Sequence, residues 1–132
     1  MKAVRCLVAP LAAAMVLTTG YGSVAVPAKR VTLTNPDSGR SVEASVGDSI
    51  EVRLTGYRDG VRVYTWDVPQ PSDSAVLRRT AGGTTPSGGA SAVFHVQRSG
   101  VARINVVRKC HPDPGHICPL IIVPWKATIG VK

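Results

Sequence analysis

Two cysteines and two histidines lie close together near the C-terminal end of the 132-residue sequence. They are Cys110, His111, His116 and Cys118. Thiolates and imidazoles are common zinc ligands, and four of them would complete a tetrahedral site. The two cysteines alone would instead form a disulfide. The spacing Cys-His-x4-His-x-Cys matches no common zinc module, so the choice between these chemistries depends on the redox compartment.

The beginning of the sequence predicts that compartment. Residues 1–25 resemble a secretory signal peptide, with Lys2 and Arg5 in a basic start and an apolar run over 6–17. Ser23 and Ala25 give the small-x-small pattern of a cleavage site, and 26–28 offer a second one. The apolar run is short and contains a proline, which disfavours a spanning helix, although an uncleaved anchor is the alternative. We therefore expect a secreted or cell-envelope protein with no membrane attachment after cleavage.

Cleavage would remove Cys6 and leave Cys110 and Cys118 as the only cysteines. An even number of cysteines in an oxidising compartment favours a disulfide over thiolate ligation of a metal. The sequence therefore predicts a Cys110–Cys118 disulfide, with zinc as the alternative, and we expect no cofactor.

Other chemistry finds little support in the sequence. No serine lies in a G-x-S-x-G motif, and no paired carboxylates recur at an informative spacing, so we do not expect an enzyme. The formal charge is +8, or +6 without Lys2 and Arg5. Because the basic residues are scattered along the chain, we expect no nucleic-acid partner.

The elements that would position these residues are short strands. Residues 49–54 place Ile50, Val52 and Leu54 on one face, and similar runs lie at 29–34, 40–45, 61–66, 74–80 and 90–96, and on both sides of the cysteine loop. Residues 55–60, 81–89 and the proline-containing cysteine loop are expected to be loops. About seven short strands at this spacing predict one all-β domain over 29–132, a sandwich or a small barrel.

Several stretches together resemble a known family. They are the Gly-Asp turn and strand over 46–52, Tyr64-Thr65-Trp66, the run from Ser87 to Phe94, and the strand opened by Gly100. Over about 32–131 the chain resembles the chagasin-like cysteine-peptidase inhibitors, which have an immunoglobulin-like β-sandwich. Two of the family's loop motifs differ. Asn-Pro-Thr-Thr-Gly reads Asp-Gly-Val-Arg-Val over 59–63, and Arg-Pro-Trp falls on Cys-His-Pro over 110–112, with a Pro-Trp pair about a dozen residues later.

The resemblance implies a secreted, noncovalent inhibitor of papain-like cysteine peptidases. Residues 82–91 would approach the catalytic thiolate, where glycines permit close contact, and residues 57–63 and 109–118 would grip the cleft walls. The candidate contact residues are Asp59, Gly60, Arg62, Tyr64, Gly88, Gly89, Ala90, His111, Pro112 and Trp125. We expect bulky replacements of Gly88 and Gly89 to weaken inhibition and to leave the fold intact.

Other interpretations of these features remain open. Trp66 is expected in the sandwich core, Trp125 either packs beside the last strand or anchors the partner, and residues 82–91 could be a plain flexible connection. For the whole chain, the alternative is a secreted or wall-associated immunoglobulin-like binding module without inhibitory activity.

Overall fold

The computed structural model describes residues 27–132, so the predicted signal peptide lies outside the described residues. The described chain is almost entirely β-structure, with one short 3-10 helix, η1 (Asn35–Asp37). The strands are β1 (Arg30–Leu33), β2 (Ser41–Ala44), β3 (Ser49–Leu54), β4 (Tyr57–Asp59), β5 (Arg62–Trp66), β6 (Gln70–Pro71), β7 (Leu77–Thr84), β8 (Ala90–Val96), β9 (Gly100–Val106), β10 (Arg108–Pro112) and β11 (Trp125–Val131). No helix in this part of the chain is long and apolar enough to span a membrane.

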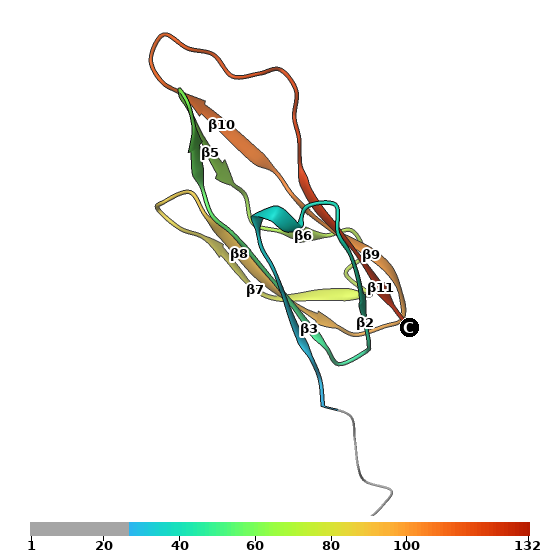
Figure 1. Cartoon of the computed structure of the whole chain (residues 1–132). Coiled ribbons are helices and arrows are strands. Elements are labelled where there is room, and N and C mark those ends of the chain that lie inside the picture. The colour runs from blue at the N-terminus through green and yellow to red at the C-terminus, as the bar shows by residue number, and fades with distance from the viewer. Residues whose placement is uncertain (1–26) are drawn as a thin grey trace, which may run out of the picture.

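Two four-stranded sheets form the sandwich, and the fold is all-β and immunoglobulin-like (Figure 1). One sheet has the order β1-β3-β8-β7 and the other β2-β11-β9-β6. Strand β1 runs parallel to β3 and β2 runs parallel to β11, whereas the other pairs are antiparallel. The chain changes sheets at η1, between β1 and β2.

The core lies between the two sheets and follows the period-two alternation of the sequence. Ile50 and Val52 of β3 and Phe94 of β8 face Ile104 of β9 and Ile129 of β11, and all of these side chains are fully buried. Burying side chains of this size contributes about 1.5–3 kcal/mol each. The alternation is clearest in β8, β9 and β11, where alternate residues are buried along each strand.

A buried carboxylate closes the β2–β3 turn. Asp48 is 3% exposed, and its two oxygens accept hydrogen bonds from the backbone N–H groups of Lys29 and Ser45, both at 2.9 Å. These donors favour the charged carboxylate and lower the pKa of Asp48 below its ordinary value of 3.8. Asp48 thereby joins the residue that precedes β1 to the turn that precedes β3.

A third sheet, with the order β10-β5-β4, extends the molecule beyond one end of the sandwich (Figure 1). The chain passes from β9 almost directly into β10, leaving the sandwich, and residues 113–124 return it to β11. We call this third sheet together with residues 113–124 the arm. The arm is the main addition to the expected sandwich.

The arm also corrects the strand prediction. Residues 57–59 and 109–112 were expected to be loops, but they belong to β4 and β10, which pair with β5. Likewise, residues 81–84 belong to the edge strand β7 rather than to a flexible loop. These strands are largely exposed, so they are held in place by hydrogen bonds to a neighbouring strand. Because neither face is buried, their sequences lack the alternation of apolar and polar residues that marks a core strand.

Candidate functional site

Three chain segments meet at the arm end of the sandwich. They are the β4–β5 hairpin, the β7–β8 turn and the segment from β10 to β11 (Figure 1). These segments contain or overlap the three stretches expected to contact a peptidase, residues 57–63, 82–91 and 109–118. Two of these stretches lie in the arm, which extends beyond the end of the sandwich. We therefore take this end of the molecule as the candidate site.

The β7–β8 turn has a defined shape. In the turn Thr85-Pro86-Ser87-Gly88, the N–H of Gly88 donates to the carbonyl of Thr85 at 3.0 Å, and Pro86 occupies the position that proline favours. The N–H of Thr85 donates to the carbonyl of Gly89, and the Thr85 hydroxyl accepts from the N–H of Gly89. The flexible connection considered for this region is therefore wrong for the turn itself.

The turn is also fastened to strand β5. The backbone N–H of Trp66 donates to the carbonyl of Gly88 at 3.0 Å. A Cβ placed on Gly88 would lie 2.7 Å from the methyl of Thr65, and a Cβ on Gly89 would lie 2.7 Å from the carbonyl oxygen of Leu54. Gly88 in addition has a φ of +90°, which L-residues rarely adopt.

These contacts overturn one expectation of the sequence analysis. Bulky residues at Gly88 and Gly89 would disturb the fold, because each glycine touches a neighbouring strand and Gly89 is buried. The exposed part of the turn is instead Thr85, Pro86 and Ser87. Glycine here lets one strand approach another closely, whether or not a partner protein binds.

An aromatic cluster joins the arm to the sandwich. The rings of Tyr57 and Tyr64 are stacked with centroids 5.1 Å apart, and Trp66 lies 6.4 Å from Tyr57. The guanidinium of Arg108 lies 4.2 Å above the Tyr64 ring and donates to the Tyr57 hydroxyl at 2.7 Å. Trp66 is buried, and its indole N–H donates to the carbonyl of Thr55, which confirms the predicted core role.

Polar contacts hold the outer part of the arm. Arg58 of β4 forms an ion pair with Asp113 at 2.9 Å, and Arg62 of β5 donates to the carbonyl of Ile117 at 3.1 Å. The Thr65 hydroxyl and Nε2 of His111 lie 2.9 Å apart. Exposed pairs of this kind contribute little individually, so the ladder between β5 and β10 and the covalent link described next must carry most of the arm's order.

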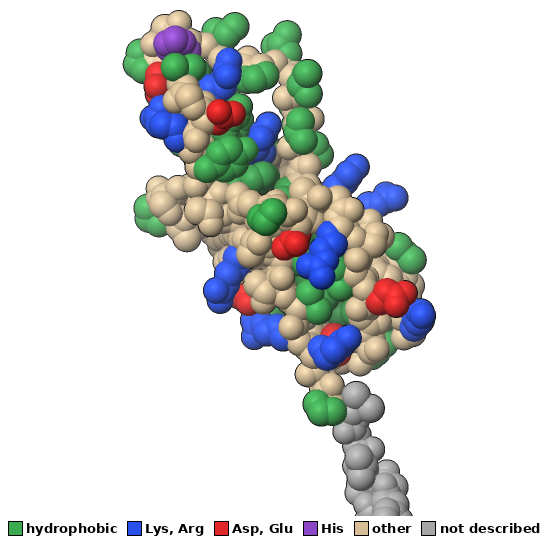
Figure 2. Space-filling view, in the orientation of Figure 1, with side chains coloured by type: hydrophobic (Ala, Val, Ile, Leu, Met, Phe, Trp, Pro, Cys, Tyr) green, Lys and Arg blue, Asp and Glu red, His purple; other side chains and the backbone are tan. Residues whose placement is uncertain are grey.

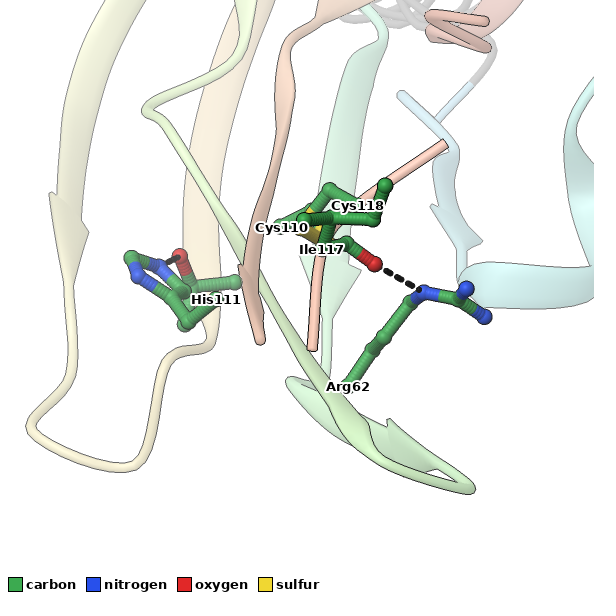
Figure 3. Close-up of a disulfide and its surroundings, with 6 residues drawn as sticks. Arg62, Cys110, His111, Ile117 and Cys118 are labelled. Carbon is green, nitrogen blue, oxygen red and sulfur yellow. Dashed lines mark hydrogen bonds between the residues drawn. A yellow bond between two sulfur atoms is a disulfide. The ribbon is translucent and has the colours of Figure 1, made fainter. Parts of the chain in front are cut away.

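Cys110 and Cys118 form the predicted disulfide (Figure 3). The His111 ring points away from the two sulfurs toward Thr65. Within residues 27–132 no group of three or more histidine, cysteine, aspartate or glutamate side chains is arranged to hold a metal. A sulfur committed to a disulfide is no longer a thiolate ligand, so the zinc alternative is wrong for this structure.

The other predicted contact residues fall into two groups. Asp59, Gly60, His111 and Pro112 are exposed on the arm, where Arg62 pairs with both Asp59 and Pro112 across the strands. A second group is buried: Tyr64 (5% exposed), Ala90 (2%) and Trp125 (2%).

Buried side chains cannot grip a partner, so these three positions are corrected to structural roles. The indole N–H of Trp125 donates to the backbone carbonyls of Thr34 and Asn35, at 3.1 and 3.2 Å. This is the packing alternative considered for Trp125, and the aromatic-anchor alternative is wrong. Its alternation with the apolar residues of β11 is the signal that could have placed it in the core.

Two features of this end were not predicted. One is a run of aliphatic side chains over 117–123, which stands clear of the body of the molecule at the upper right of Figure 2. The other is a hollow of about 460 Å³ at the base of the arm. It is lined by Tyr57, Trp66, Arg108, Val123, Pro124 and Trp125, together with residues of η1 and its flank.

Comparisons with known proteins place the fold but not the family. No family model and no curated protein matches the sequence. The structure is similar to that of the cysteine protease inhibitor EhICP2 from Entamoeba histolytica, with a TM-score of 0.54 and 9% identity over 82% of this chain and 100% of the other. It is also similar to the inclusion body protein PixA from Burkholderia cenocepacia, with a TM-score of 0.50 and 9% identity over 83% of this chain and 99% of the other.

A third structure, that of amebosin, has 15% identity and a TM-score of 0.46 over 81% of this chain and all of the other. The fold is therefore one that a cysteine protease inhibitor uses, and EhICP2 is an inhibitor rather than an enzyme. Because an inclusion body protein shares the fold, the function has to be argued from the site.

Proposed function

We propose that this protein is a secreted or cell-envelope inhibitor of papain-like cysteine peptidases, acting without covalent chemistry. The observation that carries the proposal is the joint presentation of the β7–β8 turn and the arm, which includes the β4–β5 hairpin, at one end of an immunoglobulin-like sandwich. The fold shared with EhICP2 supports a cysteine protease as the partner.

The β7–β8 turn is the part of this end best suited to enter a narrow cleft. Its tip, Thr85-Pro86-Ser87, is exposed, while the glycines behind it hold it against β5. A turn already fixed by hydrogen bonds loses little conformational entropy on binding, which favours affinity. Its backbone would cover the catalytic thiolate and exclude substrate.

The arm would contact the wall of the same cleft. Asp59, Gly60, His111 and Pro112 are exposed on either side of β5, and the ladders of β5 with β4 and β10 fix their position. Because Thr65 contacts both His111 and the Gly88 region, the turn and the arm would move as one unit. A partner would therefore meet two rigid projections at once.

The test is inhibition of papain by the purified protein, measured with a fluorogenic peptide substrate. We expect competitive inhibition at or below micromolar concentration. Pro86→Glu changes an exposed turn tip and places a negative charge against the catalytic thiolate, so it should raise the inhibition constant at least about tenfold, or 1.4 kcal/mol.

Val46→Glu is the matched control, because Val46 is an exposed turn residue between β2 and β3, at the other end of the sandwich. It should leave inhibition unchanged. Full activity of papain and of cathepsin-type peptidases in the presence of the wild-type protein would overturn the proposal.

The alternative function is that of a secreted or wall-associated binding module. It is favoured by the two altered loop motifs and by the exposed aliphatic run beside the arm. A partner other than a peptidase, bound by a protein that leaves papain active, would support this alternative.

A further inference from the structure

Residues 117–123 form an exposed aliphatic segment, which we call the strap. Ile117, Leu120, Ile121, Ile122 and Val123 are 54–98% exposed, and Leu120 is the extreme at 98%. Figure 2 shows hydrophobic side chains along this segment. Large aliphatic side chains gathered this closely on a surface indicate an interaction site rather than the scattered exposure of an ordinary surface.

The strap is presented at a defined place by its two ends. Cys118 is bonded to β10 through the disulfide, and the carbonyl of Ile117 accepts from Arg62 (Figure 3). The other end continues through Pro124 into Trp125, which is buried in the core. Between these ends, Leu120, Ile121 and Ile122 take part in no backbone hydrogen bond of the described chain. The strap therefore offers both apolar side chains and unpaired backbone to a partner.

We propose that the strap inserts into an apolar cleft on the partner peptidase whose rim carries carboxylates. This inference rests on the proposed function and adds to it the chemistry of the partner surface. The strap itself has no charged side chain. Its side chains would be buried most favourably against apolar groups, so the complementary surface is an apolar cleft.

The charges beside the strap indicate the acidic rim. Arg62 contacts the strap, and Arg108 lines a small hollow beneath Ile121 and Ile122. Neither arginine has a carboxylate partner among residues 27–132, whereas the nearby Arg58 and Lys109 are paired with Asp113 and Asp67. Carboxylates on the partner would complement these two guanidinium groups.

The same charges argue against a second copy of this chain as the occupant. Residues 27–132 contain 14 of the 16 basic residues and all 8 acidic ones, a net charge of +6, so two copies repel each other. Two straps brought together would also place Arg62 and Arg108 of one copy near those of the other.

A membrane surface fits less well. The chain between β10 and the strap carries the polar residues Asp113 and His116. Sinking the strap into hydrocarbon would take these polar groups and the unpaired amides of 120–122 with it, at a cost of several kcal/mol per amide.

The test compares a strap variant with a matched control on the same sandwich. In Leu120→Ser/Ile122→Ser the replaced side chains are 98% and 77% exposed, so the fold should be kept. The control, Val46→Ser/Val101→Ser, replaces two exposed aliphatic residues away from the arm. Binding to papain with its thiol blocked is measured by calorimetry, alongside inhibition of active papain.

We expect the strap variant to weaken both binding and inhibition by about 10- to 100-fold, which corresponds to about 1.4–2.8 kcal/mol, and the control to leave both unchanged. Wild-type binding should also weaken between about 0.05 and about 0.5 M salt, because the rim pairs are screened.

The outcomes separate this inference from the proposed function. Undiminished binding and inhibition by the strap variant would overturn the inference while the inhibitor function stands. No inhibition by the wild-type protein would overturn both. Strap-dependent dimers in sedimentation, or strap-dependent binding to anionic lipid vesicles without an effect on papain binding, would assign the strap to a second copy or to a membrane and would also overturn the inference.

Discussion

Thr65 lies where the turn, the sandwich and the arm meet. Its methyl group fills the space beside Gly88, and its hydroxyl contacts His111 of β10. One small residue on β5 therefore sets how closely the β7–β8 turn approaches and how β10 is oriented. Neither contact is visible in the sequence, because both partners are distant from Thr65 along the chain.

We predict that Gly88→Ala destabilises the fold by about 1–3 kcal/mol. The backbone at this position has a φ of +90°, which is strained for any residue that carries a Cβ. The added Cβ would also lie only 2.7 Å from the methyl carbon of Thr65. Replacing Thr65 with serine removes that methyl, so Gly88→Ala should cost less in a Thr65→Ser background. Urea unfolding of the wild type, the two single variants and the double variant measures the coupling energy between the two substitutions. Equal costs in both backgrounds would show that the methyl contact is unimportant.

At the scale of elements, the strands that build the core could be predicted from the sequence. Strands β3, β8 and β9 are buried on one face, so their apolar residues alternate. Strands β4, β7 and β10 could not be predicted in the same way. They contain glycine, proline and charged residues, and are held by pairing with β5 or β8. Exposed strands leave no periodic signal, because neither of their faces is buried and their residues need not alternate between apolar and polar.

The candidate site was predicted to a similar extent. The disulfide predicted from the sequence is confirmed, and the fold brings the three segments chosen from the sequence to one end (Figure 1). It did not separate exposed from buried members: Tyr64 and Trp125 carry aromatic rings that suit a contact surface and a core equally well. Only the packing of the two sheets decides which of these roles a residue has.

The disulfide is expected to stabilise the arm rather than the sandwich. It links β10 to the strap, and few apolar contacts hold the arm's outer part. In Cys110→Ser/Cys118→Ser, the arm should open more easily by about 2–3 kcal/mol. Hydrogen exchange should therefore accelerate in β10 and β5, while β8 and β9 keep their protection. Equal acceleration in all four strands would instead mean that the arm and the sandwich unfold together.

On the scale of the whole molecule, the buried carboxylate of Asp48 makes the stability of the fold depend on pH in the acidic range. Backbone donors from Lys29 and Ser45 lower its pKa, so the charged form is favoured in the folded state. This contribution is fully present above the unfolded pKa, near 3.8, and is lost as the pH falls through the lower folded pKa.

Asp48→Asn should therefore be less stable than the wild type at neutral pH, and the difference should shrink below about pH 4. Unfolding free energies measured from neutral pH downward check this. Glu43, an exposed carboxylate on the neighbouring β2, provides the control as Glu43→Gln. A difference between wild type and Asp48→Asn that stays constant with pH would contradict the predicted role of the Asp48 charge.

The strap also bears on how this molecule stays in solution. Leu120-Ile121-Ile122-Val123 is a run of strong β-formers with unpaired amides, the composition that templates cross-β stacking. Pro119 and Pro124 bracket it, and neither can donate a backbone hydrogen bond, so at most four consecutive residues can join a growing ladder. Steric zippers form from segments of about six or seven residues. Pro119 and Pro124 thus act as gatekeepers against fibril growth, and the +6 charge of residues 27–132 adds repulsion between copies.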